Sequence, residues 1–177
     1  EEAKEEYSLD AYNVLQEVHG IGPAKARDLI KHGIKTITQL QEKATANPDL
    51  LTHAQTVGLT YIDDLKKRIP RAEMEKHEAY VRKMLPKEFE MVVVGSYRRG
   101  LPNSGDFDVM ITSRSLSELV AASHFQQFID LLVDEGYLRG EFARGEHKFM
   151  GVSKLPRHQT HRHVDLLLCK PDEYWYT

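Results

Sequence analysis

The chain has 177 residues, of which 41% are hydrophobic and 29% are charged, with a formal net charge of −3. This is the composition of a globular protein, with room for one ordinary domain or two small ones. No apolar run reaches the roughly 18 to 20 residues that a membrane span needs, so we expect no membrane partner. The single cysteine, Cys169, excludes an internal disulfide and a zinc site built from cysteines. The nearly balanced charge argues against a protein that coats nucleic acid by bulk charge, although local phosphate contacts stay open.

The first part of the chain, residues 1–69, has the pattern of short helices separated by glycine and proline. Pro23 suits the first turn of a helix, and Asn47-Pro48 is a typical helix end. The pattern predicts a small all-helical module. We expect its helices near residues 8–18, 23–33 and 38–46, followed by two short helices within residues 51–68 that are hinged near Gly58.

The residue pattern changes at Pro70. From there on, segments with the composition of β-strands alternate with longer amphipathic helices. We expect helices over residues 72–85 and 117–135, the second with Leu119 and Phe125 facing inward. Strands are expected over residues 89–94, 107–112, 147–152 and 163–169. Residues 70–177 are therefore predicted to form an α+β module that follows the helical one.

A helix-hairpin-helix pattern occupies residues 18–26 of the helical module. Gly20 and Gly22 permit a tight turn, and the next helix begins directly after it, so its unpaired N–H groups face outward toward a phosphate oxygen. Lys25 adds positive charge. Such a site binds the nucleic-acid backbone without reading bases. A plain helix–helix turn is the alternative, and a second, weaker phosphate-binding candidate lies at Gly58.

The most informative segment is residues 94–109, where a buried strand runs into Gly95-Ser96 and the next strand begins with an Asp-x-Asp motif. Residues two apart on a strand point to the same face, so Asp106 and Asp108 converge and repel unless a cation lies between them. Oxygen ligands of this kind favour Mg²⁺ or Mn²⁺. Asp165 is the one acid in an apolar strand, and we expect it to complete the set. A phosphate-binding loop beside a divalent-metal site indicates a nucleotidyl-transfer centre.

Together these motifs resemble those of the family X DNA polymerases, most closely the beta and lambda type. The resemblance runs from about Leu15 to Tyr176 and rests on several separated blocks. The blocks are HGIGP at residues 19–23, KRIPR at 67–71, GSYRRG at 95–100, SGDFD at 104–108, GEHKFMGV at 145–152 and VD at 164–165.

The resemblance implies a fingers module to about Ile69 and, from Pro70, a nucleotidyltransferase-type palm with a mixed β-sheet flanked by helices. It implies that Asp106, Asp108 and Asp165 hold two Mg²⁺ ions, for which Mn²⁺ can substitute. The dNTP phosphates are expected at Ser96, Arg99 and Gly105, with Arg68 as a more distant phosphate contact.

The resemblance also implies contacts with gapped or primer-template DNA. The matching positions are Gly20, Gly22, Lys25, Lys148 and His163. The backbone carbonyls of Gln16, Val18 and Ile21 match a site for a monovalent cation, Na⁺ or K⁺, that lies against the DNA strand. Two positions depart from the beta-type pattern, because His163 and Leu167 stand where that pattern has arginines.

The activity implied is template-directed addition of deoxynucleotides to a primer 3′-hydroxyl in gap-filling base excision repair, by a monomer. A nuclear location is expected, with a mitochondrial or viral origin as alternatives. The family's amino-terminal lyase domain and carboxy-terminal subdomain have no counterpart in these residues, so we expect a truncated form. Two other functions stay open: a DNA-binding fragment with weak or no catalysis, and a template-independent nucleotidyltransferase.

Overall fold

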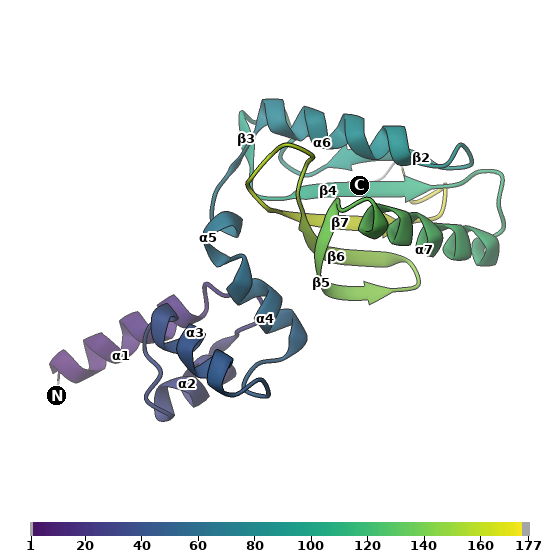
Figure 1. Ribbon diagram of the computed structural model, residues 1–177. Helices are drawn as coiled ribbons and strands as arrows, with labels where there is room; N and C mark the ends of the chain where they lie inside the picture. Colours follow the sequence, from purple (N-terminus) through teal and green to yellow (C-terminus); the bar gives the residue numbers. More distant parts are fainter. Residues whose placement is uncertain (1, 175–177) are drawn as a thin grey trace. The chain divides into compact units, whose positions relative to one another are not determined.

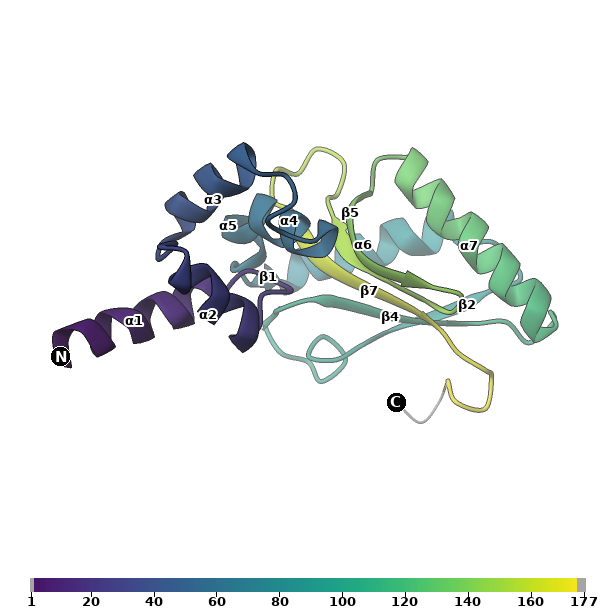
Figure 2. The same ribbon diagram turned by 90° about the horizontal axis from the view of Figure 1, so that it is seen from below.

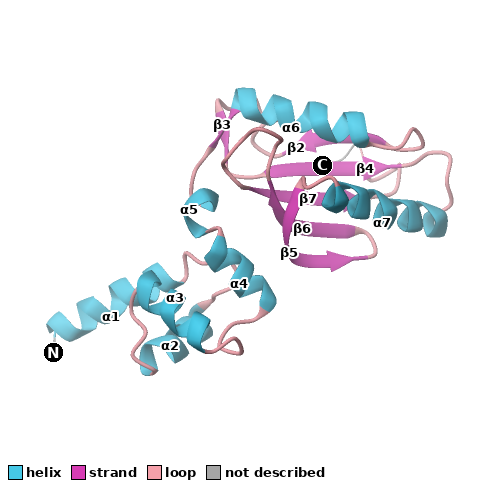
Figure 3. Ribbon diagram, viewed as in Figure 1, coloured by secondary structure: helices cyan, strands magenta, loops and turns pink. Residues whose placement is uncertain are grey.

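The computed structural model describes residues 2–174 and the side chains from Leu9 onward, so Tyr176, at the end of the resemblance, lies outside the described residues. It divides into two compact units, Glu1–Ile62 and Asp63–Thr177. The first is helical and the second combines helices with a sheet (Figure 3). The predicted module boundary after residue 69 stays a prediction, and residues 63–69 group with the second unit. Among the residues described, no helix has both the length and the apolar character needed to cross a bilayer.

The first unit contains four helices: α1 (Glu2–Leu15), α2 (Pro23–Lys31), α3 (Ile37–Ala46) and α4 (His53–Thr60) (Figure 1). Threonine side chains cap two of them. Thr36 accepts a hydrogen bond from the backbone N–H of Gln39 at the start of α3, and Thr52 forms a capping box with Gln55 at the start of α4. The helices enclose a small apolar core that includes Leu15, Val18, Leu29, Leu40 and Leu59.

The expected hinge at Gly58 is wrong, because Gly58 lies inside α4 and is buried. A Cβ atom at this position would lie 2.6 Å from the carbonyl oxygen of His19, so the glycine permits close packing of α4 on the hairpin. Helix α4 instead ends at its C-cap residue, Tyr61, directly before the short helix α5 (Ile62–Leu65). The weaker phosphate-binding candidate at Gly58 is therefore also wrong, since its backbone N–H lies within a helix.

The second unit is built on a five-stranded mixed sheet in the order β2-β4-β7-β6-β5. Strands β4 and β7 run parallel, and every other neighbouring pair is antiparallel. A two-stranded ribbon, β1 with β3, lies apart from this sheet. The strands are β1 (Ile69–Pro70), β2 (Glu90–Val94), β3 (Asn103–Ser104), β4 (Phe107–Thr112), β5 (Leu138–Gly145), β6 (Lys148–Ser153) and β7 (Arg162–Leu168), and the helices are α6 (Arg71–Met84) and α7 (Glu118–Asp134).

Helices α6 and α7 cover the same face of this sheet (Figures 1 and 2). Their apolar side chains form one core with every second residue of the strands, among them Val109 of β4 and Leu166 of β7. Because successive strand residues point to opposite faces, Asp108 and Asp165 lie on the face that the two helices leave uncovered. The fold therefore separates a buried structural face from an open face that carries the acids.

Two details of the second unit differ from the prediction. Strand β5 was not expected, because its sequence LRGEFARG is polar and rich in glycine, and its pairing with β6 contains two register shifts. Leu119 is 85% exposed, whereas Phe125 is fully buried. Leu119 and the buried Ala121 are two residues apart and so are turned by about 200° on the helix, which places Leu119 on the solvent side.

Candidate active site

Three carboxylates meet on the open face of the sheet. The parallel register of β4 and β7 places Asp108 directly opposite Asp165, and Asp106 immediately precedes β4. One carboxylate oxygen from each of the three residues lies within 4.8 Å of the other two. The structure thus brings together the three acids singled out in the sequence, although Asp108 and Asp165 are 57 residues apart along the chain.

The negative charges of this cluster are only partly compensated by the described residues. Burial, followed by the negative charges of Asp106 and Asp165, raises the pKa of Asp108 to about 7. Burial alone would raise the pKa of Asp165, but the hydrogen bonds of His163 and Asp108 and the charges of His163 and Lys148 together lower that pKa. Nε2 of His163 lies 3.3 Å from Oδ1 of Asp165, a buried oxygen that accepts no well-aligned hydrogen bond from the described residues. A set of hard oxygen donors with excess negative charge fits a divalent cation.

The glycine-rich loop that follows β2 lies against this cluster. Gly95 has a φ of +78°, and a Cβ atom there would lie 3.1 Å from Oδ2 of Asp108, so a larger residue would press on the carboxylate. Ser96 comes next and is half-buried, while Arg99 is exposed. Arg99 lines an open hollow of about 570 Å³ whose wall also includes both Asp108 and Asp165. The loop therefore presents backbone groups and a cation next to the acids.

Arg71, at the start of α6, holds this loop, a role that the sequence reading missed. Its Nη1 donates to the carbonyl oxygen of Tyr97 at 2.9 Å and to that of Leu101 at 3.4 Å. Its guanidinium also lies 4.4 Å from the centre of the Tyr97 ring, and its backbone N–H donates to Pro102. The only sequence signal for this role was the position of Arg71 in the KRIPR block.

The other residues predicted to contact the nucleotide phosphates or the duplex border the same region. Arg68 donates from Nε to Oδ1 of Asn103 at 2.8 Å, and its Nη1 lies 3.1 Å from where a Cβ on Gly105 would be. Lys148, at the start of β6, is exposed and lines the hollow. His163 is the direct neighbour of Asp165, and its ring makes an edge contact with Phe142. In this structure His163 therefore acts as a carboxylate partner.

In the first unit, the helix-hairpin-helix has the expected turn. Gly20 adopts a φ of +90°, and Gly22 is the extended N-cap of α2 with no side chain capping the helix. The first N–H groups of α2 are therefore not used by a capping side chain. Lys25 donates from Nζ to the carbonyl oxygen of Leu50 at 2.7 Å, so its charge is fixed beside that segment.

The backbone positions predicted for a monovalent cation lie in the same turn. The carbonyl oxygen of Val18 accepts a hydrogen bond from the N–H of Ile21 at 3.0 Å, which leaves it one further lone pair. The side chains of Val18 and Ile21 are buried in the helical core, and the side chain of Gln16 donates to the carbonyl oxygen of Tyr12. The cation at this turn stays a prediction.

Comparison with known protein families gives two consecutive matches. The family described as DNA polymerase beta palm matches residues 68–171, which is more than half of the chain, and the fingers domain of DNA polymerase lambda matches residues 13–66. The chain belongs to the family X DNA polymerases. This confirms both the resemblance seen in the sequence and the α+β fold of fingers and palm.

Relatives of this polymerase family match along nearly the whole chain. DNA polymerase lambda of Arabidopsis thaliana is 31% identical over 92% of this chain, and that of Rattus norvegicus is 28% identical over 94%. The chain spans 32% and 30% of these two relatives. Two solved structures of Leishmania infantum polymerase beta, a ternary P/T complex and a ternary gap complex, are 36% identical with a TM-score of 0.85 over 92% of this chain. The chain covers 66% and 58% of those two chains.

Proposed function

We propose that this chain carries the DNA-binding fingers and the catalytic palm of a template-directed DNA polymerase that fills gaps during repair. The observation that carries the proposal is the pairing of Asp108 with Asp165 across two parallel strands, with Asp106 within 4.8 Å. The solved relatives, described as a ternary P/T complex and a ternary gap complex, support primer-template and gapped DNA as substrates.

Different residues are proposed to bind the metal ions, to hydrogen-bond the nucleotide phosphates and to supply positive charge. Asp106, Asp108 and Asp165 provide the oxygen ligands for two Mg²⁺ ions, with Mn²⁺ as a substitute, and the bound ions supply activation of the primer 3′-hydroxyl and charge neutralisation of the triphosphate. The hydroxyl of Ser96 and the backbone N–H groups of Gly95-Ser96 hydrogen-bond the dNTP phosphates, since the N–H groups of Arg99 and Gly100 already donate to carbonyl oxygens within the loop. Arg99 and Arg68 add positive charge. Fixed donors of this kind orient the reacting groups without reorganisation at the moment of reaction.

The fingers residues bind the DNA backbone. The uncapped N-terminus of α2 at Gly22 offers N–H groups and a positive dipole end to a phosphate. Lys148 and His163 contribute contacts along the duplex on the palm side. A monovalent cation at the hairpin carbonyls, a monomeric state and a nuclear location belong to the same proposal and rest on the family resemblance.

Primer extension on gapped DNA with Mg²⁺ and dNTPs tests the proposal. We expect Asp165→Ala to lower the rate of incorporation by at least about a hundredfold, because it removes one ligand of the metal site. Asp134→Ala is the matched control, since Asp134 is an exposed aspartate at the end of α7. Unchanged activity of Asp165→Ala would contradict the assignment of the metal site.

The same assay separates the two alternative functions. Wild-type chain that binds gapped DNA but extends no primer would favour the DNA-binding fragment, which the uncapped α2 N-terminus also supports. Equal incorporation with and without a template strand would favour a template-independent nucleotidyltransferase.

A further inference from the structure

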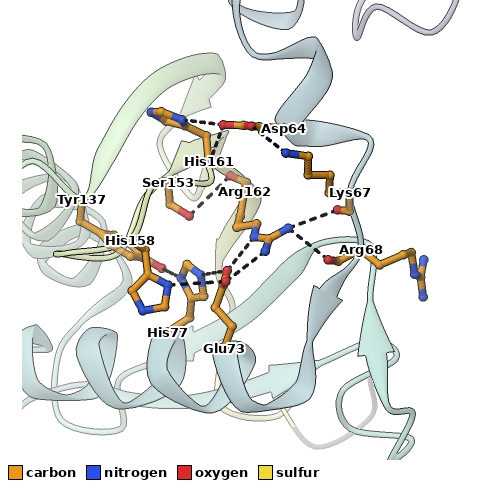
Figure 4. A network of polar contacts seen from close by, with 10 residues as sticks. All are labelled: Asp64, Lys67, Arg68, Glu73, His77, Tyr137, Ser153, His158, His161 and Arg162. Carbon is orange, nitrogen blue, oxygen red and sulfur yellow. Dashed lines mark hydrogen bonds and ion pairs between the residues drawn. The ribbon is translucent and has the colours of Figure 1, made fainter.

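A buried arginine, Arg162, stands at the start of β7, three residues before Asp165, and does not belong to the carboxylate cluster. Its side chain is 7% exposed. Nε and Nη2 of its guanidinium donate to the two carboxylate oxygens of Glu73, at 2.6 and 3.0 Å (Figure 4). This is the two-pronged geometry that only an arginine can supply to a carboxylate.

The third nitrogen of Arg162 points elsewhere. Nη1 donates to the backbone carbonyl oxygens of Arg68 and Lys67, at 3.1 and 3.4 Å (Figure 4). The preceding residue, His161, holds the same segment, because its backbone N–H and its Nδ1 both lie 3.0 Å from Oδ2 of Asp64. Arg162 thus holds the backbone just before β1, and His161, which precedes β7, holds the side chain of Asp64 a few residues earlier.

From this segment the contacts continue to the carboxylate cluster. The side chain of Arg68 is held by Asn103, and the ribbon pairs Ile69 with Ser104. Nη1 of Arg68 lies beside Gly105, which directly precedes Asp106. An unbroken path of contacts therefore runs from the strand that carries Asp165, through Arg162 and Arg68, to the turn that carries Asp106.

We infer that Arg162 is a positioning residue, which holds the exposed cation of Arg68 at a fixed place beside the carboxylate cluster so that it meets the polyphosphate of the nucleotide. The inference rests on the proposed function, in that the ligand is a nucleoside triphosphate with its divalent cation. An exposed arginine loses side-chain entropy when it binds a phosphate, and a backbone and side chain that are already held reduce this cost.

The bonds to the two carbonyl groups distinguish this role from simple stabilisation. The ion pair with Glu73 alone would compensate the buried charge of Arg162. The additional bonds go to the backbone of Arg68 itself and of the residue before it. A lysine at position 162 keeps the charge but has one nitrogen, which cannot serve both carboxylate oxygens and two carbonyl groups together.

Binding of tripolyphosphate with Mg²⁺, measured by calorimetry on the full chain well below its unfolding temperature, tests the inference. We expect Arg162→Lys to weaken binding about tenfold, a loss comparable to that of one charge-assisted hydrogen bond. Arg68→Ala should weaken it similarly, and the double variant should be no weaker than Arg68→Ala alone, since both changes remove the same contact. Arg82→Lys, which alters an exposed arginine paired with Glu78 on α6, should leave the affinity unchanged.

A second variant covers the case in which Arg162→Lys does not fold. Asn103→Ala breaks the same path at an exposed position, and we expect the same weakening and the same lack of additivity with Arg68→Ala. Where the chain extends primers, the KM for dNTP should rise in these variants more than kcat falls.

Three results would overturn the inference: full affinity in folded Arg162→Lys or Asn103→Ala, losses that add to that of Arg68→Ala, or no binding by the wild-type chain. The titration requires no turnover. A chain that binds tripolyphosphate through Arg68 but extends no primer would therefore contradict the proposed function and leave the role of Arg162 standing.

Discussion

Two carboxylates of the palm, Asp108 and Glu73, illustrate at the residue scale how neighbours decide the role of an acid. Burial and two further aspartates raise the pKa of Asp108 to about 7, so a bound cation would stabilise its ionised form. Burial also acts to raise the pKa of Glu73, but the hydrogen bonds and charges of His77 and Arg162 outweigh it and lower the pKa to about 2. Glu73 is therefore a structural carboxylate, whereas Asp108 belongs to a cluster that could hold a metal ion.

The low pKa of Glu73 predicts how the stability of the palm depends on pH. A carboxylate whose pKa falls from 4.5 in the unfolded chain to about 2 in the folded one stabilises the fold above pH 4.5, and this contribution is lost as the pH falls toward 2. We expect Glu73→Gln to lower the free energy of unfolding by about 3 kcal/mol at pH 7, because it leaves Arg162 buried without its counter-charge. Urea unfolding at pH 7 and at pH 3 measures both effects.

Glu78→Gln is the matched control for this prediction, since Glu78 pairs with the half-exposed Arg82 on the same helix. Glu78→Gln should change the free energy of unfolding by no more than about 1 kcal/mol at either pH. The difference in the free energy of unfolding between the wild type and Glu73→Gln should be smaller at pH 3 than at pH 7. A difference that is as large at pH 3 as at pH 7 would show that Glu73 does not act through its charge.

At the scale of elements, packing between neighbours positions both functional regions. The parallel register of β4 and β7 brings Asp108 and Asp165 together, and a shift of one residue would turn one of them into the core. In the helical unit, α4 lies close against the hairpin because Gly58 has no side chain. Gln55, on the same helix, donates from Nε2 to the carbonyl oxygen of Gly20. Helix α4 thus supports the turn that is proposed to bind DNA.

Gly58→Ala tests this packing. Alanine favours a helix over glycine by about 1 kcal/mol, but the added Cβ would lie 2.6 Å from a backbone oxygen of His19, which must then move. We expect a net loss of about 1 to 3 kcal/mol in the free energy of unfolding of the helical unit, together with weaker binding of gapped DNA. Gly145→Ala is the control, because no atom lies within 4 Å of its added Cβ. A Gly58→Ala chain that is more stable than the wild type would contradict the close approach.

At the scale of the whole molecule, the described residues form two apolar cores, one in each compact unit. Leu40 is fully buried in the first core, and Phe128 is 2% exposed in the second. Each unit thus has the apolar interior that a small domain needs to fold. The turn that is proposed to bind DNA belongs to the unit of the first core, and the carboxylate cluster to the unit of the second, so a change in one core should affect one proposed function first.

Leu40→Ala tests the independence of the two cores. We expect it to lower the free energy of unfolding of the helical unit by about 2 to 5 kcal/mol through loss of buried surface and formation of a cavity. Hydrogen exchange should then quicken in α2 and α3, while the amides of β4 and β7 keep their protection. Leu119→Ala, at an 85% exposed position, should change neither the stability nor the hydrogen-exchange protection of either unit. Equal loss of protection in β4 and β7 would show instead that the chain unfolds as one unit.

Much of the fold and the carboxylate site could be predicted from local patterns. The period of two along a strand indicated that Asp106 and Asp108 converge, and the cost of burying an unpaired acid indicated that Asp165 joins them. The two glycines of the hairpin indicated the turn before α2. Strand β5 could not be predicted, because it is a polar edge strand and its register depends on β6. Leu119 was misplaced because apolar character alone does not reveal which side of α7 meets the sheet.

The family, the carboxylate set and the order of the helical and mixed modules could all be predicted from the sequence, because they depend on residue types at short spacings along the chain. Contacts between distant segments showed that Gly58 is a packing contact, that Arg71 holds the loop after β2, and that Arg162 connects the strand of Asp165 to Arg68. Each of these contacts joins residues between 26 and 95 positions apart. Such contacts arise from the way the helices and strands pack, for which a single sequence has no local signal.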